Sequence, residues 1–286
     1  GFAYLDRPKT VTGRRQRQLD ELNVSALVPV YNEDPAALRS CLASLIHQTR
    51  RPQTVVVVDD GTTAPTPYEP VRSWFLHAAD AEGVEVAWMR QPNQGKRPAQ
   101  MAGVACTPAA DVYWTTDSDT ISDPAALGEL LKPLADPRVQ SVAGIMMSAN
   151  ARRSFLTRIY DMWFVAGQLV DRSSLSILGA VWVNSGPIAV YRGPVLRDHA
   201  RLYLTETFAS RRVNLSDDSF LTLFALLRGR TVQQPSAFAF ALMPERLSHF
   251  SRMYLRWMRG SFIRSLWRAR YLPLTGVAWW VHLGRW

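Results

Sequence analysis

The sequence lacks several features that mark common classes of protein. It has only two cysteines, Cys41 and Cys106, in 286 residues, which excludes a disulfide framework and a cysteine metal cluster. Both lie in apolar helical patterns, so we expect small core residues and a reducing, cytoplasmic setting. No run of 18 or more apolar residues is present, so no segment clearly predicts a membrane span.

Lysine is scarce, and acids are scarce toward the C-terminus. Lys9, Lys96 and Lys132 are the only lysines, and after Asp218 the only acid is Glu245. Arginines recur in that last stretch, and the net charge is +9. Such a basic end favours an anionic partner: nucleic acid, lipid headgroups or a phosphorylated substrate. A nucleic-acid-binding protein is the least favoured class, because zinc ligands, a recognition helix and an RNA-binding aromatic motif are missing.

Apolar segments of strand periodicity alternate with segments of helical periodicity. Strands are expected at residues 24–30, 54–61, 84–90 and 111–117, and helices at 34–48, 69–83 and 97–106. This alternation predicts an α/β fold with a mostly parallel sheet that is buried on both faces. We expect the sheet to occupy residues 24 to about 147.

Polar segments follow each of the four expected strands, among them VYNED, DDG, QPNQGKR and TDSDT. The carboxyl ends of parallel strands share one edge of a sheet, and ligands bind there. Acids, amides and basic groups should therefore converge on one crevice. Nicotinamide and common ATPase chemistry are not supported, because the motifs GxGxxG and GxxxxGK[ST] are both absent.

The segment TDSDT carries Asp117 and Asp119 two positions apart. In extended backbone both side chains point to the same side, where like charges repel each other. A divalent cation such as Mg²⁺ or Mn²⁺ would offset that repulsion, with diphosphate oxygens completing its shell. A polar turn without a ligand is the alternative, because Asp and Ser are common turn residues.

Seven motifs in order resemble those of the processive family 2 glycosyltransferases, which include bacterial hyaluronan synthases and chitin synthases. They span about residues 25–270 and are VPVYNED, VVVVDDG, QPNQGKR, DSDT, NSGPIAVYR, SDDSFLTL and RW. The resemblance implies a GT-A fold with interfacial amphipathic helices, a UDP-sugar donor, Mg²⁺ or Mn²⁺, and a growing polysaccharide as acceptor. A hyaluronan synthase-like enzyme is the first expectation, and a synthase that uses a single donor sugar is the alternative.

The resemblance also implies a location. The catalytic domain is expected on the cytoplasmic face of the plasma membrane, with lipid as a partner. The first residue is Gly1 rather than Met, so membrane helices are expected outside this sequence.

The resemblance assigns the nucleoside to residues that follow the first two strands. Tyr31 and Glu33 would hold the nucleoside. Either Asp59 or Asp60 would bind uracil or ribose while the other caps the following loop, and the sequence leaves the order open.

The phosphate and metal contacts follow from the next two motifs of the family. Lys96 would contact the diphosphate with Arg97 as its helper, unless both belong to a solvated helix start. Asp119 would bind the metal directly, and Asp117 would contact the nucleotide, or the metal through water.

The resemblance places the catalytic base in SDDSFLTL. Asp218 would take the proton of the acceptor hydroxyl in an inverting transfer, with Asp217 in support. Ser216 stands where the family has glycine, and a plain helix start with Ser216 as its N-cap is the alternative. Because a helix N-terminus lowers a carboxylate pKa, we expect Asp218 to be ionised at neutral pH.

Two further motifs are assigned to the acceptor. Ser185, Gly186 and Pro187 would line the acceptor site, unless Gly-Pro is merely a turn. In the RW motif, Arg256 would offset charge on the departing UDP and Trp257 would stack on the acceptor sugar. Met253 lies on the same expected helix as the RW motif. The family has glutamine at this position, so the resemblance does not imply full processivity.

The expected organisation has five parts. These are a basic connector (1–23), a nucleotide-sugar half (24–147), an acceptor and base half (148–247), the RW helix (248–270) and the start of a membrane-interface or transmembrane segment (271–286). For the last part a C-terminal core helix is the alternative. An apolar stripe within 155–170 predicts either a core helix or a membrane-interface helix.

Overall fold

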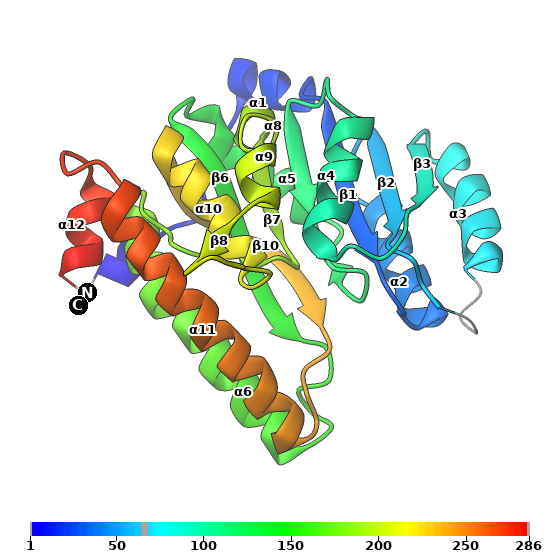
Figure 1. Cartoon of the computed structure of the whole chain (residues 1–286). Helices are drawn as coiled ribbons and strands as arrows, with labels where there is room; N and C mark the ends of the chain where they lie inside the picture. The colour runs from blue at the N-terminus through cyan, green and yellow to red at the C-terminus, as the bar shows by residue number, and fades with distance from the viewer. Residues whose placement is uncertain (1, 64–67, 285–286) are drawn as a thin grey trace.

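An eight-stranded sheet runs through the protein in the order β3-β2-β1-β4-β7-β6-β10-β5 (Figure 1). The computed structural model describes residues 2–63 and 68–284. The strands are β1 (Val24–Val30), β2 (Thr54–Asp59), β3 (Glu85–Arg90), β4 (Val112–Thr115), β5 (Ile121–Ser122), β6 (Val139–Ser148), β7 (Ala189–Arg192) and β10 (Arg230–Ala241). The predicted α/β fold with a mostly parallel sheet is confirmed.

The first four strands lie as the sequence predicts. β1 pairs in parallel with both β2 and β4, and β2 pairs in parallel with β3. Along the chain, β2 and β3 are therefore added on one side of β1, and β4 is then added on its other side. This reversal between β1 and β4 is the kind of switch point at which open α/β sheets form a crevice.

The expected end of the sheet near residue 147 is wrong. β7 lies antiparallel between β4 and β6, and β10 lies parallel to β6. The two segments predicted as a nucleotide-sugar half and an acceptor half therefore contribute strands to one sheet. Local periodicity does not reveal this, because β7 has four residues and pairs with strands far away in the sequence.

Helices cover both faces of the sheet, each with its own core. Along β1, Ala26 and Val28 join the core under α2 (Pro35–Ile46) and α3 (Glu69–Ala81). Leu27 points the other way, toward α4 (Lys96–Cys106), α8 (Gly193–Arg197) and α10 (Asp217–Arg228). This alternation follows from the two-residue period of a strand.

Shorter elements fill the edges. They are η1 (Phe2–Leu5), α1 (Gly13–Asp20), α5 (Ala126–Leu131), η2 (Lys132–Ala135), a π-helical turn (Gln168–Arg172), α7 (Ser173–Ile177), α9 (Ala200–Leu204), β8 (Thr207–Phe208), β9 (Arg211–Arg212) and α12 (Val277–Leu283). Of the two cysteines expected in the core, Cys41 is buried, whereas Cys106 is exposed because it ends α4.

Two long helices lie side by side and project away from the sheet (Figure 1). They are α6 (Phe155–Gly167) and α11 (Leu247–Tyr271), and aromatic contacts join them at Tyr160–Phe250, Trp163–Tyr254 and Phe164–Trp257. Much of the apolar stripe predicted within 155–170 is exposed, including Phe155 at 79% and Met162 at 66%. Within the described residues, every helix is too short or too polar to cross a bilayer.

Candidate active site

Lys96, at the start of α4, joins the two acidic motifs. Its Nζ lies 2.5 Å from Asp117 Oδ1. Burial lowers the pKa of Lys96, but the negative charges of Asp117, Asp218 and Asp217 outweigh it and raise the pKa above its ordinary value. Lys96 is therefore a permanent cation between the TDSDT turn and the SDDS turn, which lie about 100 residues apart in sequence.

The TDSDT turn gathers more negative charge than the protein neutralises. Burial, followed by the charges of Asp117 and Glu33, raises the pKa of Asp119 to about 6. Glu33 accepts a hydrogen bond from Ser118 Oγ at 2.9 Å, and its predicted contact with a nucleoside stays a prediction. A bound cation would relieve this repulsion, because it would favour the ionised form of each acid.

The residues present fit a divalent metal that is shared with a substrate. Across the part of the chain that the structure describes, no three His, Cys, Asp or Glu side chains come together as a metal site. The two aspartates of the turn would supply part of an oxygen shell, and diphosphate oxygens would supply more. Asp119 and Asp117 are therefore the residues that would hold such an ion, and their role as metal ligands stays a prediction.

Asp218 lies in the first turn of α10, as predicted, but its electrostatics differ from the prediction. Burial raises its pKa to about 6, against the lowering effects of Lys96 and of a hydrogen bond from the Gly186 backbone. The charges of Asp117 and Asp217 raise it further. The expected lowering by the helix N-terminus is wrong because loss of solvation is the larger effect. Such a pKa still leaves the carboxylate mostly ionised at pH 7.

Of the predicted acceptor segment Ser185, Gly186 and Pro187, the middle residue lies against Asp218, which brings this segment to the predicted base. A Cβ on Gly186 would stand 2.6 Å from Asp218 Oδ1 and 2.9 Å from Oδ2. Only glycine therefore allows the backbone to approach the carboxylate this closely. Ser185 Oγ accepts a hydrogen bond of 2.7 Å from the buried Arg172.

Gly186→Ala is expected to lower the sugar transfer that the motif resemblance implies about tenfold or more, because the new methyl group displaces the Asp218 carboxylate. The measurement is the steady-state rate of nucleotide release from the sugar donor. Gly167→Ala is the matched control, since no atom lies within 4 Å of a Cβ built there. Equal rates for Gly186→Ala and the wild type would contradict the close approach described above.

Arg97 makes contacts within the protein, and its predicted help in binding the diphosphate stays a prediction. The side chain is buried, and its Nε donates to Asp217 Oδ1 at 2.5 Å. Its other nitrogens donate to Glu206 and to the carbonyls of Tyr203 and Leu215. This geometry favours a structural contact with the turn of Asp217 and Asp218, and the supporting role of Asp217 in catalysis stays a prediction.

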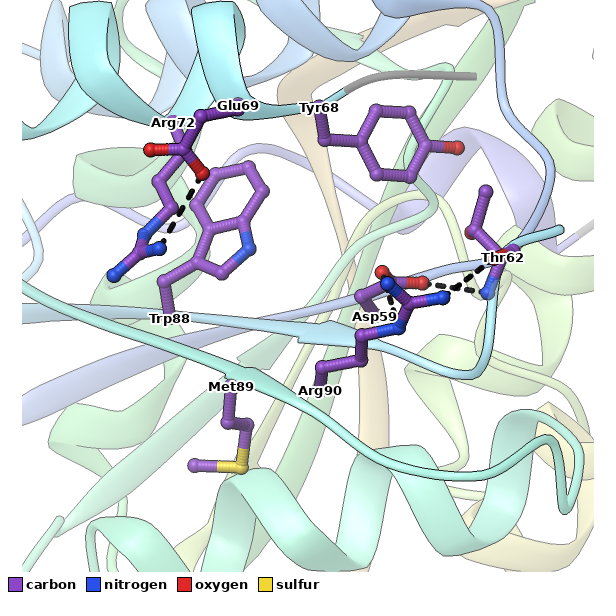
Figure 2. Close-up of a pocket in the computed structure, with 8 residues that line it drawn as sticks. All are labelled: Asp59, Thr62, Tyr68, Glu69, Arg72, Trp88, Met89 and Arg90. Carbon is purple, nitrogen blue, oxygen red and sulfur yellow. Dashed lines mark hydrogen bonds and ion pairs between the residues drawn. The ribbon is translucent and has the colours of Figure 1, made fainter. Parts of the chain in front are cut away.

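Asp59 and Asp60 both cap loops, but their other surroundings differ, and which of them binds a nucleoside stays a prediction. Asp60 accepts hydrogen bonds from the side chain of Gln91 and from the backbones of Gln94 and Gly95. It therefore caps the loop that leads to Lys96. Asp59 accepts a hydrogen bond from the Thr62 backbone at 2.8 Å, so it caps the loop after β2. It also lines a pocket at the ends of β2 and β3, where Figure 2 shows Arg90 beside it.

That pocket has a volume of about 410 Å³. It is lined by Asp59, Thr62, Tyr68, Glu69, Arg72, Trp88, Met89 and Arg90. Figure 2 shows aromatic rings of Tyr68 and Trp88 beside the polar groups of Asp59 and Arg90. The Asp59 carboxylate can accept hydrogen bonds, and it lies beside flat apolar rings. This combination suits a planar heterocycle that bears N–H groups.

The remaining predicted residues lie at the edges of this arrangement. Tyr31, at the end of β1, is 50% exposed. Arg256 is exposed on α11, and the ring of Trp257 packs against Phe164 with centroids 6.1 Å apart. Met253 packs against the main core. The contacts expected of Tyr31, Arg256 and Trp257 with substrates stay predictions.

Three buried residues near the site carried no signal in the sequence. Glu206, Arg264 and Arg172 are 7%, 0% and 8% exposed. Each is bonded to residues distant in sequence, such as Arg264 to Glu206 and Arg172 to Gln233. One feature of the sequence could have drawn attention to Glu206, because it is the only acid between Asp198 and Asp217.

Comparison with solved structures places the fold in a known class. A mannosyltransferase from Pyrobaculum calidifontis, in complex with GDP-mannose and Mn²⁺, superposes with a TM-score of 0.65 at 21% sequence identity. The alignment covers 91% of this chain and 68% of that one. The sheet order and helix placement are therefore those of the GT-A fold.

Comparison of sequences identifies the family. The profile of glycosyl transferase family 2 matches residues 25–199. An N-acetylglucosaminyltransferase of Azorhizobium caulinodans is 35% identical over 84% of this chain and 59% of its own length. A hyaluronan synthase of Streptococcus pyogenes is 32% identical over 86% of this chain and 58% of its own. The chain belongs to glycosyl transferase family 2, and it spans less than two thirds of the length of these relatives.

Proposed function

We propose that the protein is a membrane-associated, inverting β-glycosyltransferase that moves a sugar from a UDP-sugar to a growing polysaccharide. The product favoured first is a hyaluronan-like polymer. The observation that carries the proposal is the position of Lys96 between two acidic turns, bonded to Asp117 and close to Asp218. The turn of Asp117 and Asp119 suits a metal, and the turn of Asp218 suits a general base. The groups proposed for the donor and for the acceptor therefore meet at Lys96.

The donor would lie along the strand ends. The uracil would enter the pocket beside Asp59, whose carboxylate would accept from a base N–H. The diphosphate would extend toward Lys96, with Asp119 and Asp117 holding Mg²⁺ or Mn²⁺. When bound, that ion would supply charge stabilisation to the departing diphosphate. The complex of the fold relative with GDP-mannose and Mn²⁺ supports a nucleotide-sugar and a divalent ion as ligands.

The acceptor would lie beside the loop of residues 185–187. Asp218 would take the proton of the attacking hydroxyl while the sugar–phosphate bond breaks on the opposite side of the anomeric carbon. A single displacement of this kind inverts the anomeric centre. The pKa of about 6 suits the task, because Asp218 is then ionised at neutral pH yet basic enough to hold a proton in transit.

The membrane part of the proposal rests on the surface of the projecting helices. Exposed apolar residues on this pair are Phe155, Ile159, Met162, Trp163, Leu247, Leu255, Met258 and Phe262. Exposed arginines accompany them, among them Arg252, Arg256 and Arg259. Apolar and cationic groups together favour a surface of anionic lipid, which supports a place on the cytoplasmic face of the plasma membrane.

Assay of single donors tests the function. Membranes of a host that produces the protein would receive UDP-N-acetylglucosamine, UDP-glucuronate or both, with Mn²⁺ or Mg²⁺, and released UDP and polymer would be measured. If the product is a hyaluronan-like polymer, sustained polymer synthesis should occur only when both donors are present. Polymer from UDP-N-acetylglucosamine alone would establish the single-donor alternative, which the similarity to an N-acetylglucosaminyltransferase favours. Absence of UDP release with each donor would reject both.

A further inference from the structure

Glu206 lies in the turn between α9 and β8, and its side chain is 3% exposed. Its carboxylate accepts hydrogen bonds from two arginines and one indole. Arg97 donates at 2.8 Å, Arg264 donates twice at 2.5 and 3.1 Å, and Trp267 donates from Nε1 at 2.8 Å. Charged donors around one buried carboxylate hold each other in a fixed geometry.

The two arginines that bind Glu206 also hold the turn that carries the candidate base. Arg97, from α4, donates to Asp217 Oδ1 at 2.5 Å and to the Leu215 carbonyl at 2.8 Å. Arg264, from α11, donates to Ser219 Oγ at 3.3 Å and to the same carbonyl at 3.4 Å. Asp218 lies between these attached positions, so its backbone is restrained from both sides.

Charge is balanced inside this buried group. The guanidiniums of Arg97 and Arg264 face the carboxylates of Glu206 and Asp217. Burial lowers the pKa of Arg264, while its hydrogen bonds to Glu206 oppose that shift. Loss of one carboxylate would leave two buried cations against a single acid, an arrangement that is strongly unfavourable.

The same group attaches α11 to the base turn. Arg264 and Trp267 belong to α11, which carries Trp257 about two helical turns earlier. Gly260 lies between Trp257 and Arg264 in the sequence and faces Ser216. A Cβ on this glycine would come within 2.1 Å of Ser216 Oγ. The helix therefore lies directly against the residue that precedes the acidic pair.

We propose that Glu206 is a positioning residue for sugar transfer. Through its two arginines it fixes the Asp217–Asp218 turn against α11, so that the base keeps its aim toward the acceptor loop at Gly186. The inference rests on the proposed function, because it assigns to Glu206 a part in placing that reaction's base. Glu206 acts through other residues and touches no substrate.

Glu206→Gln tests the proposal, because it keeps the shape and removes one negative charge. We expect kcat to fall about tenfold or more, while the KM for the donor changes less than about threefold. The acid limb of the rate profile, near pH 6 in the wild type, should move about 0.5–1 pH unit lower. Loss of the negative charge of Glu206 favours ionised Asp218, whose facing groups Lys96, Asp117 and Asp217 are unchanged.

Glu129→Gln is the matched control. Glu129 likewise accepts from a cation and two polar side chains, Lys132, Gln234 and Ser236, at a place remote from the base. Both kcat and the acid limb should stay at wild-type values there. A loss of kcat in Glu206→Gln without movement of the acid limb, or wild-type values of both, would overturn the proposal.

The double variant Glu206→Gln/Arg264→Gln restores the charge balance of the buried group. It tests the proposal if the single variant does not accumulate. We expect its acid limb to return to the wild-type pH while kcat stays reduced, because α11 is no longer attached to the base turn. A fully wild-type kcat in the double variant would overturn the proposal. A wild-type protein that releases no UDP from any donor would reject the proposed function, which is a separate result.

Discussion

Asp218→Asn is expected to lower sugar transfer by about 10²–10⁴-fold, the usual contribution of a positioned general base. Asparagine keeps the size of the side chain and the hydrogen bond from the Gly186 backbone, but it cannot accept the proton of the acceptor hydroxyl. The measurement is polymer formation and UDP release at saturating donor. Because only the proton transfer is lost, kcat should fall much more than the KM for the donor changes.

Asp198→Asn is the control for this variant. Asp198 makes an exposed ion pair with Arg228 at 2.8 Å and lies outside the site. Its replacement should leave transfer within about twofold of the wild type, since exposed ion pairs contribute little. Full polymer synthesis by Asp218→Asn would remove this residue as the base and leave the SDDS turn as a helix start.

Asp119→Asn is expected to reduce metal-dependent transfer by about 10²–10³-fold, because loss of a metal ligand forfeits several kcal/mol of charge stabilisation. Direct titration of Mn²⁺ in the presence of UDP should show weaker binding than in the wild type. Asp80→Asn, an exposed carboxylate on α3, is the matched control and should bind Mn²⁺ normally. Unchanged Mn²⁺ affinity in Asp119→Asn would move the metal site elsewhere.

The same variant should be more stable than the wild type when metal is absent. The pKa of Asp119 is raised to about 6 in the folded protein, so folding favours its protonated form. The stability that this carboxyl contributes is present at low pH and is lost as the pH rises through about 6. At pH 7.5 the neutral asparagine avoids that loss, and the midpoint of thermal unfolding should rise by about 2–5 °C.

Opposite effects on stability and activity in one variant are the signature of a functional site. In a turn that served only as a surface connection, we would not expect burial and the charges of Asp117 and Glu33 to raise the pKa of Asp119. The repulsion among them is a cost that the fold tolerates, and a cation with its nucleotide would remove it. Lys96 offsets part of the charge in the meantime through its contact with Asp117.

Much of the site could be predicted from the sequence because its parts are local. Asp59, Asp60, Asp117 and Asp119 follow apolar strands, and parallel strands bring such ends to one edge. Asp218 opens a helix whose start is visible in the sequence. The sequence did not separate Asp59 from Asp60, because adjacent strand residues point to opposite sides and only the partners of each decide its use.

The sequence by itself determined the alternation of strands and helices, the acidic strand ends and the family motifs, because these depend on neighbours within a few residues. Only the tertiary structure decided that β7 and β10 extend the sheet and that Arg97 is buried against Asp217. It also decided the direction of the Asp218 pKa and the place of Glu206. Burial and long-range pairing arise only when distant segments meet, so no local pattern contains them.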